Sequence, residues 1–535
     1  MTEESKIKKS LQIFLIGFIL LQPFLDTIYL YSENVISIFG FSPSTIVRFA
    51  AVAVLLAALL FAKWVPAKTK IVIGAYLGVV LIYFVLHHLA AGSFVLHNGK
   101  VLDYSILSEF FYVCRLTLPI LLIFITYYIG VPLKSILKVF VWLSLIMSSI
   151  IIASNLLCIS LDSYTNETIK ANIFSWFTDG YRLAGFNGLA SKGFFYFANQ
   201  ISAVFMMIFP IVFLVAVRQK SILAGATLIL QSIAMIMLGT KIATFGMVLA
   251  MVFCLCVYLF FVIIHKEKWN WIALSVSLLV LLLGVILIPR SPALFRLDVH
   301  NNTVSINQQS EVDETSSKSS SVPQSSASSA SVSVSSSRAE KTQVGGQSGS
   351  IPNASLTKEE KLQYIEENYE RLKINKRFIL EAYPYEYDPD FWYDILCQPA
   401  EKRLDNRFIE LSMIQRAKVL GATEIHDLFG ISYNKMSSFF NVERDIVSQY
   451  YSMGIIGVIL FFGPFFLFLL GALYLLFRNF KKNFHITNVL LTAPLAIVLL
   501  AGFISGNTLD NMFVTILMGF LCAGLCKSLR EAPMQ

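Results

Sequence analysis

The most constraining feature of this sequence is a series of long apolar runs that recur along most of its 535 residues. A helix needs about 20 apolar residues to cross the hydrocarbon core of a bilayer. Only 14% of the residues are charged and 56% are hydrophobic, whereas soluble domains carry about 25% charged residues. The chain is therefore predicted to be a polytopic membrane protein, which excludes a soluble enzyme and makes nucleic acid an unsuitable partner.

Twelve of these runs are predicted to be membrane-spanning helices. The run 221–264 must contain two of them, because it is too long for one crossing and Gly239-Thr-Lys241 supplies a turn with a charge. The sequence thus predicts an all-α fold with about twelve transmembrane helices. The predicted spans are 11–31, 43–62, 71–91, 111–130, 136–158, 197–217, 221–239, 242–264, 271–289, 452–477, 486–505 and 510–526.

The distribution of lysine and arginine predicts the orientation of these spans. With the N-terminus inside, 17 basic residues fall in the short inner segments, and few fall in the short outer loops. Cytoplasmic loops of membrane proteins carry such an excess of basic residues. We therefore expect a multi-pass plasma-membrane protein with both termini in the cytoplasm. The same orientation makes the one long hydrophilic segment, residues 290–448, extracellular.

The long external segment is predicted to have two parts. Its first part contains the Ser-rich stretch Ser316–Ser337, which cannot bury enough apolar surface to fold and is expected to be a flexible tether. Its second part starts with a capping box at Thr357 and Glu360 and continues with apolar residues at helical spacing. The predicted divisions are 1–289 with spans one to nine, 290–356 as a disordered linker, 357–448 as an extracellular helical domain, and 449–535 with spans ten to twelve.

The external domain contains an unusual segment, Tyr383–Asp394, that is dense in aromatic and acidic residues. Pro384 and Pro389 are expected to prevent a helix there. Tyrosine and tryptophan gather at membrane interfaces, and aromatic rings also stack on sugar rings. Packing at the interface and contact with a sugar both remain open from the sequence.

Three external places hold cations that are candidates for binding an anion. Arg182 lies in a Gly-rich loop before the sixth span, and a guanidinium can bind a phosphate through two hydrogen bonds. Lys241 lies in the tight turn described above. Arg403 and Arg407 are four residues apart, and we expect them to share a helix face, where nearby acidic residues or a bound diphosphate would offset their repulsion. The alternatives are an interfacial Arg182 and a hydrated Lys241.

Two carboxylates, Glu443 and Asp445, lie just before the tenth span. They are candidates for accepting a proton from a sugar hydroxyl, or for pairing with Arg444. Gly454 and Gly457 in that span are expected to permit close approach of another helix. The external histidines are scattered and the seven cysteines lack metal-ligand spacing, so neither a metal nor a cofactor is predicted.

In these motifs the chain resembles the O-antigen ligase and O-antigen polymerase superfamily, which includes surface-polysaccharide polymerases of Gram-positive bacteria. Arg182-Leu-Ala-Gly185 followed by Ala198-Asn199 looks like the family's Arg-x-x-Gly segment with its downstream Asn. Gly239-Thr-Lys241 is similar to a short Ser-Arg turn of the family. Arg407 and Leu428-Phe-Gly430-Ile resemble its loop arginine and the Gly-rich stretch that follows. The resemblance covers most of the membrane part, through short motifs.

One motif departs from the pattern of the ligases in this family. They carry a His, a small polar residue, nine further residues and then Gly-x-x-Gly-Thr. Counting back from Gly454 places Glu443 at the His position, while Arg444 replaces the polar residue and Val458 replaces the Thr. This departure favours a polymerase or a divergent transferase over a ligase.

The resemblance implies a metal-independent glycosyltransferase without a cofactor, acting on the outer face to build a surface polysaccharide. Its donor would be a glycan on undecaprenyl diphosphate, and its acceptor another glycan. A ligase that attaches finished glycan to the cell wall is one alternative. A flippase or exporter of lipid-linked oligosaccharides is another, although the two related halves common in transporters are not seen here. The external helices would either cap the site or recruit a chain-length regulator.

The same resemblance implies roles for the candidate residues. Basic residues would hold the diphosphate and stabilise the charge that develops as it leaves, and a carboxylate would activate the acceptor hydroxyl. The implied diphosphate ligands are Arg182, Lys241, Arg403 and Arg407, and the implied catalytic residues are Glu443, Asp445 and Arg407.

Overall fold

The computed structural model describes residues 3–30, 42–178, 188–266, 268–299, 301, 356–439, 442–504, 506 and 508–530. Among these residues the regular structure is helical, with two isolated β-bridges and no strand. This confirms the predicted all-α fold. The chain divides into two compact units. The membrane unit comprises Met1–His97, Val101–Val299 and Ala417–Gln535, and the loop unit comprises Asn98–Lys100 and His300–Arg416.

Eleven helical segments of the described residues are long and apolar enough to cross a membrane. A shorter apolar helix, α9 (Ile222–Met237), corresponds to the remaining predicted span. The eleven segments are α1 (Glu3–Leu25) with η1 (Thr27–Leu30), α3 (Pro43–Phe61), α4 (Ala67–Ser93), α5 (Ile106–Ile129), α6 (Leu133–Leu156), α8 (Ala198–Gln219), α10 (Lys241–Ile264), α11 (Trp271–Leu287) with its continuation to Val299, α19 (Asp445–Phe461) with α20 (Gly463–Arg478), α22 (Ile486–Ile504) and α23 (Met512–Arg530).

The turn between α9 and α10 lies where the sequence predicts it. Gly239 has φ +65°, and a Cβ there would lie 2.8 Å from the Cβ of Ala190, so a larger residue would be strained and crowded. Thr240 caps α10, because its hydroxyl accepts a hydrogen bond of 3.2 Å from the amide of Ala243. The long run 221–264 is therefore divided into two helices by a glycine turn and an N-cap.

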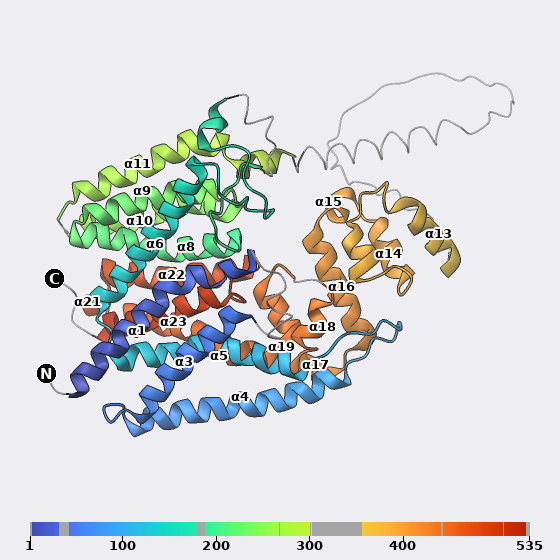
Figure 1. Ribbon diagram of the computed structural model, residues 1–535, viewed down its shortest axis with the longest axis horizontal. Helices are drawn as coiled ribbons and strands as arrows, with labels where there is room; N and C mark the ends of the chain where they lie inside the picture. Colours follow the sequence, from blue (N-terminus) through green and yellow to red (C-terminus); the bar gives the residue numbers. More distant parts are fainter. Residues whose placement is uncertain are drawn as a thin grey trace, which may run out of the picture. The chain divides into compact units, whose positions relative to one another are not determined.

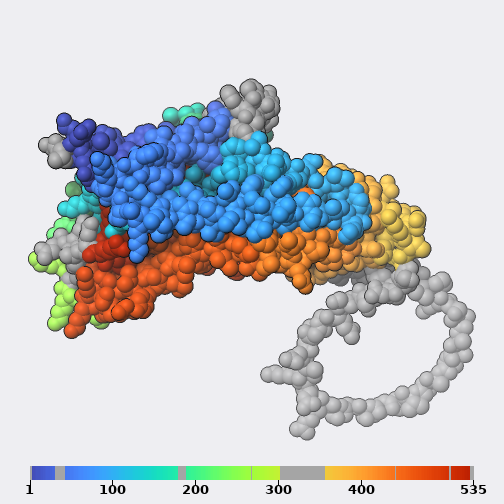
Figure 2. Space-filling view, turned by 90° about the horizontal axis from the view of Figure 1, so that it is seen from below, coloured from blue at the N-terminus to red at the C-terminus, as the bar shows by residue number. Residues whose placement is uncertain are grey.

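Two helices form the centre of the membrane unit. In both α8 and α23, 94% of the residues in the most apolar stretch of the helix are buried, whereas in α4 only 22% are. α8 packs against α6, α9, α10 and α22, and α23 packs against α5 and α22 (Figure 1). α4 lies at the periphery beside α19, and Figure 2 shows its blue residues next to the orange ones. The exposed apolar residues of α4 therefore face the position that lipid occupies around a polytopic protein.

The chain enters and leaves the membrane unit at the same end, where α1 begins and α23 ends (Figure 1). The tenth predicted span is not one continuous helix, because Gly454 within α19 has φ +70° and ψ 178°. α20 then restarts at Gly463, with a proline in its first turn, where a missing backbone N–H is tolerated.

The loop unit consists of short helices. It contains α13 (Lys358–Asn368), the π-helix η5 (Arg377–Ala382), α14 (Pro389–Leu396), α15 (Ala400–Arg403) and the first part of α16 (Asn406–Gly421). The predicted capping box is confirmed: the Thr357 hydroxyl accepts from the amide of Glu360 at 3.3 Å, and the Glu360 carboxylate accepts from the amide of Thr357 at 2.7 Å.

The aromatic segment of the loop unit forms part of its core. Tyr383 and Trp392 are fully buried, and the indole N–H of Trp392 donates to the carbonyl of Tyr383 at 2.6 Å. Asp388 accepts from the Tyr383 hydroxyl at 2.9 Å and pairs with Arg416 at 2.7 Å. The expectation that Pro389 prevents a helix is wrong, because Pro389 begins α14 at a position where proline is favoured.

The two compact units divide within α16, between residues 416 and 417. The sequence-based division at 448 followed the start of the apolar run instead. The residues between these positions form α17 (Glu424–Phe429) and α18 (Tyr433–Ser437) and belong to the membrane unit. The predicted Ser-rich tether, Ser316–Ser337, lies outside the described residues.

Candidate functional site

A partly buried ion pair joins α5 to the turn before α23. The Nη2 atom of Arg115 lies 2.9 Å from an oxygen of Asp510. Asp510 also accepts a hydrogen bond of 2.6 Å from the hydroxyl of Tyr112 and one of 3.1 Å from the side-chain Nε2 of Gln449 on α19. The Arg115 and Asp510 side chains are 23% and 22% exposed, so one side of the pair is accessible. Ionisable groups within spans are costly and mark functional positions by default.

Arg115 retains hydrogen-bonding capacity at this place. Among the described residues its buried Nε has no hydrogen-bond partner, and a guanidinium offers five N–H donors in one plane. The guanidinium lies 5.2 Å from the ring centre of Tyr112, and the Tyr433 ring stacks on Tyr112 with centroids 3.9 Å apart. Burial and the charge of Asp510 raise the pKa of Tyr433, which therefore stays a neutral phenol. The arrangement is suited to binding an anion against aromatic rings.

Asp445 holds the turn that carries Asp510. It is buried, and one of its oxygens accepts the backbone amides of Thr508 at 2.8 Å and Leu509 at 2.5 Å. Hydrogen bonds of this kind stabilise a carboxylate in its ionised form. This makes Asp445 a positioning residue for Asp510, since its carboxylate is engaged by backbone.

Glu443 lies at the same turn and is half-buried. A Cβ placed on Gly506 would lie 2.5 Å from the Cα of Glu443, so the two backbones are in close contact. The structure thus brings together both sequence-predicted carboxylates, Glu443 and Asp445, at the turn that ends with Asp510.

Two glycines allow the segment before α18 to enter the break in α19. A Cβ on Gly430 would lie 2.1 Å from the carbonyl oxygen of Ser452, and one on Gly454 would lie 2.3 Å from that of Leu428. Both glycines have positive φ, +82° and +70°. The group that approaches Gly454 is thus the backbone of the Gly-rich stretch and not another spanning helix.

The same contact includes backbone hydrogen bonds. The amide of Ile431 donates to the carbonyl of Tyr451 at 2.9 Å, and the amide of Ser432 donates to that of Ser452 at 3.1 Å. Carbonyls that the break in α19 releases are satisfied in this way. Because Tyr433 follows directly, this pairing determines where its ring meets the ring of Tyr112.

A buried histidine and glutamate attach this segment to α4 and α5. His87 and Glu109 are 0% exposed, with Nε2 3.1 Å from the carboxylate. The Nδ1 atom of His87 lies 2.5 Å from the carbonyl of Phe429, which can only accept, so Nδ1 carries a hydrogen. Glu109 accepts the backbone amides of Tyr433 at 2.5 Å and Asn434 at 3.3 Å. The pair therefore holds both ends of the turn that positions Tyr433.

A further ion pair joins the turn after α1 to α3. Arg48 is 1% exposed and contacts both oxygens of Asp26, at 2.7 and 3.0 Å. It also donates to the side chain of Gln22 at 2.9 Å, and Gln200 of α8 donates to Asp26 at 3.4 Å. Since this arginine is enclosed and bidentately paired, its evident role is to fix the three helices together.

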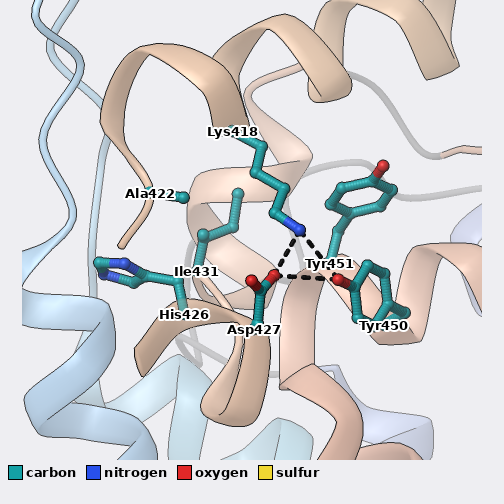
Figure 3. Close-up of a pocket in the computed structure, with 7 residues that line it drawn as sticks. All are labelled: Lys418, Ala422, His426, Asp427, Ile431, Tyr450 and Tyr451. Atoms are coloured by element: carbon teal, nitrogen blue, oxygen red, sulfur yellow. Dashed lines mark hydrogen bonds and ion pairs between the residues drawn. The ribbon is translucent and has the colours of Figure 1, made fainter. Parts of the chain in front are cut away.

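Figure 3 shows a small pocket where α16, α17 and α19 meet. Lys418 forms an ion pair with Asp427, and the hydroxyl of Tyr450 lies 2.9 Å from each of their charged groups. The hydrogen bond from Lys418 lowers the pKa of Asp427. His426 also lines the pocket, and its ring contacts the carbonyl of Ala90 at 2.9 Å. These polar groups satisfy one another, so the pocket is a weaker candidate for an anion site than Arg115.

The two predicted arginines of the loop unit have different environments. Arg403 is buried and donates to the backbone carbonyl of Gln398 at 3.0 Å, whereas Arg407 is exposed. The expectation that they share one helix face is wrong, because α15 ends at Arg403 and α16 starts at Asn406. Because the helix breaks between them, the side chain of Arg403 is buried and that of Arg407 is exposed.

The other two cations predicted to bind a diphosphate are Arg182 and Lys241. Arg182 and its Arg-x-x-Gly segment lie outside the described residues, while Ala198 is the first residue of α8. Lys241 is the exposed first residue of α10. Diphosphate binding by each of these cations stays a prediction.

The residues at the centre of this site are not among those predicted from the sequence motifs. Arg115 lies inside the predicted span 111–130 and His87 inside 71–91, and neither these two residues nor Glu109 was among the predicted site residues. A charged or polar group inside an apolar run is itself a signal of function. A search of the predicted spans for such groups finds Arg115 and His87, but their pairing with Asp510 and Glu109 is a tertiary property.

Comparison with known proteins gives one result for the whole chain. Residues 8–532 match the family described as O-antigen ligase like membrane protein. No curated protein matches the chain. The match extends over both compact units and confirms the resemblance found in the short motifs.

Proposed function

Because this chain belongs to the O-antigen ligase-like family of membrane proteins, and so takes part in polysaccharide assembly by glycosyl transfer, we propose which donor and which acceptor it uses. The donor is a glycan on undecaprenyl diphosphate, and the acceptor is the end of another glycan. The transfer takes place on the outer face of the plasma membrane, needs no metal or cofactor, and builds a surface polysaccharide by polymerisation.

The observation that carries this proposal is the accessible Arg115–Asp510 pair beside Tyr112. Transfer of a glycan from a diphosphate leaves negative charge on the departing oxygen. A guanidinium that is already oriented stabilises this charge without reorganising. Asp510 and Tyr112 provide the orientation.

The family-like motifs add further proposed ligands. Arg182, Lys241 and Arg407 are proposed diphosphate ligands on the strength of the family-like motifs. Arg403 is less suited, because its guanidinium donates to backbone carbonyls of the loop unit.

Glu443 is the proposed general base, and Asp445 is proposed to keep the turn in place. The acceptor hydroxyl oxygen attacks the anomeric carbon of the donor, and its proton passes to Glu443. The bond between that carbon and the diphosphate oxygen breaks, and the electron pair leaves with the diphosphate. Glu443 is half-buried at the turn before Asp510, which suits a group that meets a substrate.

A ligase is the second candidate, and it would use the same donor with a cell-wall acceptor. The Glu at the ligases' His position favours the polymerase. A flippase or exporter of lipid-linked oligosaccharides is the candidate from a different class. In the polymerase, the loop unit would cap the site or recruit a chain-length regulator.

The test is a comparison of surface glycan and lipid-linked glycan on gels. Cells that lack the gene would be complemented with the wild type, with Arg115→Ala or with Arg182→Ala. Arg478→Ala is the control, because Arg478 is an exposed residue at the end of α20 and contacts Tyr474. We expect single repeat units on lipid for Arg115→Ala and Arg182→Ala, and a normal glycan ladder for Arg478→Ala.

Other outcomes of this experiment have distinct meanings. A full ladder that stays on lipid and is absent from the wall would favour the ligase. Repeat units trapped on the inner face would favour the flippase. Full activity of Arg115→Ala with normal protein levels would contradict its role in binding the diphosphate.

A further inference from the structure

Other segments of the membrane unit hold the turn Gly239–Lys241, which joins α9 to α10. The hydroxyl of Tyr164 donates a hydrogen bond of 2.6 Å to the carbonyl of Gly239. The amide of Ser191 donates one of 2.7 Å to the carbonyl of Met237, the last residue of α9. The backbone of this turn is therefore held by contacts from outside its own two helices, and these contacts fix the direction in which Lys241 leaves it.

Tyr164 is itself held in place by a buried carboxylate. Asp162 is 0% exposed, and one of its oxygens accepts the backbone amides of Tyr164 at 3.0 Å and Thr165 at 2.9 Å. Asp162 also forms an isolated β-bridge with Ser191, which connects the two segments that bind the turn. Burial raises the pKa of Tyr164, so its phenol keeps the proton that it donates to the turn.

Arg296 packs on the ring of the same tyrosine. It belongs to the helical continuation of α11, and its guanidinium carbon lies 3.9 Å from the ring centre of Tyr164. Pro292, one helical turn earlier, lies against the turn, since its Cβ is 3.0 Å from the position of a Cβ on Gly239. Attraction to the face of an aromatic ring holds an arginine in place without neutralising its charge. Tyr164 thus links Arg296 to the turn that carries Lys241.

Lys241 and Arg296 are two cations without an acidic partner. Both side chains are exposed, and no carboxylate of the described residues forms an ion pair with either of them. Arg115, in contrast, pairs with Asp510. In the predicted orientation the turn is external, where basic residues are scarce, so orientation does not account for these charges. Like charges held near one another repel, and an anion between them offsets that repulsion. The pair therefore indicates a site for an anion.

We propose that Arg296 is a further diphosphate ligand beside Lys241, and that Tyr164 positions both cations. The inference rests on the proposed function, because it takes Lys241 as a ligand of the donor diphosphate. A guanidinium binds two phosphate oxygens through parallel hydrogen bonds, while an ammonium adds a compact charge. Because the turn and the ring already hold the two cations, little freedom is lost when they bind. Two cations suit an anion with two phosphates better than an anion with one.

The first experiment measures binding without catalysis. The full-length protein in detergent is titrated calorimetrically with farnesyl diphosphate and with farnesyl monophosphate. We expect Arg296→Ala to weaken diphosphate binding on the order of tenfold, as the loss of a hydrogen bond between charged groups does, and to affect the monophosphate less. Arg478→Ala is the matched control, because the exposed Arg478 guanidinium also packs on a tyrosine, 5.5 Å from the ring centre of Tyr474, at the end of α20.

The second experiment separates positioning from direct binding. Tyr164→Phe keeps the ring beside Arg296 but deletes the hydroxyl that holds Gly239. The donor is lipid-linked repeat unit extracted from cells that lack the gene. We expect the half-saturating donor concentration to rise about fivefold, which corresponds to one neutral hydrogen bond, with little change in maximal rate. Amide exchange over residues 238–243 should become faster. Tyr474→Phe is the control, because it deletes a hydroxyl that accepts from Arg478 at 2.8 Å.

The outcomes distinguish this inference from the proposed function. If Arg296→Ala binds farnesyl diphosphate like the wild type, Arg296 is not a ligand. Arg296→Lys keeps the charge and should recover part of the lost affinity, and no recovery would assign the loss to packing. A Tyr164→Phe protein with a lower maximal rate and an unchanged half-saturating concentration would overturn the positioning role.

The proposed function fails separately, if cells without the gene make normal glycan. The calorimetric titrations would still decide whether Arg296 binds a diphosphate, because they involve no transfer of glycan.

Discussion

Tyr112 and Asp510 are 398 residues apart in the sequence, yet the hydroxyl of Tyr112 donates a hydrogen bond of 2.6 Å to the carboxylate of Asp510. This bond joins α5 to the turn before α23 and positions the partner of Arg115. The candidate site therefore depends on segments from the first and last quarters of the chain.

Replacing Asp510 should weaken both the site and the fold. Asp510→Asn leaves Arg115 without its counter-charge at a place that is largely desolvated. We expect a loss of roughly 1–3 kcal/mol in unfolding free energy, as for a partly buried charged hydrogen bond. Thermal unfolding in detergent measures this, and Tyr112→Phe should show a smaller loss, because it removes one neutral donor. Equal stability of Asp510→Asn and the wild type would contradict the pairing.

Alanine at Gly454 should disrupt the junction between α19 and the Gly-rich stretch. Gly454 has φ +70°, and its Cβ would lie 2.3 Å from the carbonyl oxygen of Leu428. Strain of this kind costs about 1–3 kcal/mol before the clash is counted. Gly78→Ala on α4 is the control, since nothing lies within 4 Å of a Cβ there. Similar melting temperatures for the two variants would show that the junction tolerates a side chain.

Removing the glutamate of the buried pair should loosen the turn that carries Tyr433. Glu109→Ala deletes the acceptor of the Tyr433 and Asn434 amides and leaves His87 without its partner. We expect faster amide hydrogen exchange over residues 428–434, with little change in α8, which packs at the centre. Unchanged exchange in that turn would argue against its attachment through Glu109.

The Lys418–Asp427 pair should make stability depend on acid. Lys418 lowers the pKa of Asp427 below its usual 3.8. The stabilisation of the folded state by this ion pair is therefore fully present above about pH 3.8, and it is lost as the pH falls through the lowered pKa. We expect Lys418→Gln to be less stable than the wild type at pH 7, with the difference shrinking below pH 3.8. Denaturation of both proteins across this range measures the effect. A difference that is independent of pH would exclude the ion pair as its source.

Deletion of the Ser-rich stretch should leave activity nearly intact. Residues 316–337 are almost devoid of large apolar side chains, and such composition does not support a packed structure. The glycan ladder from cells that carry this deletion should match that of the wild type at equal protein levels. An inactive deletion protein that still inserts normally would show that the stretch does more than connect.

Local patterns accounted for most of the helices. The turn at Gly239 and the capping box at Thr357 were predicted correctly, because glycine turns and N-caps act over a few residues. The break at Gly454 was not predicted, because a single glycine within an apolar run is compatible with a continuous helix. It becomes a break only when the backbone of Leu428 occupies the space beside it.

The sequence by itself determined that this chain is an all-α, multi-pass membrane protein, because bilayer thickness imposes a length and a polarity on every crossing. It also indicated the family through short motifs, now matched over residues 8–532. Only the tertiary structure decided that Arg115 meets Asp510, that Asp445 supports their turn and that Arg403 is engaged within the loop unit. Such pairings depend on the packing of distant helices, which the periodicity of any one segment does not encode.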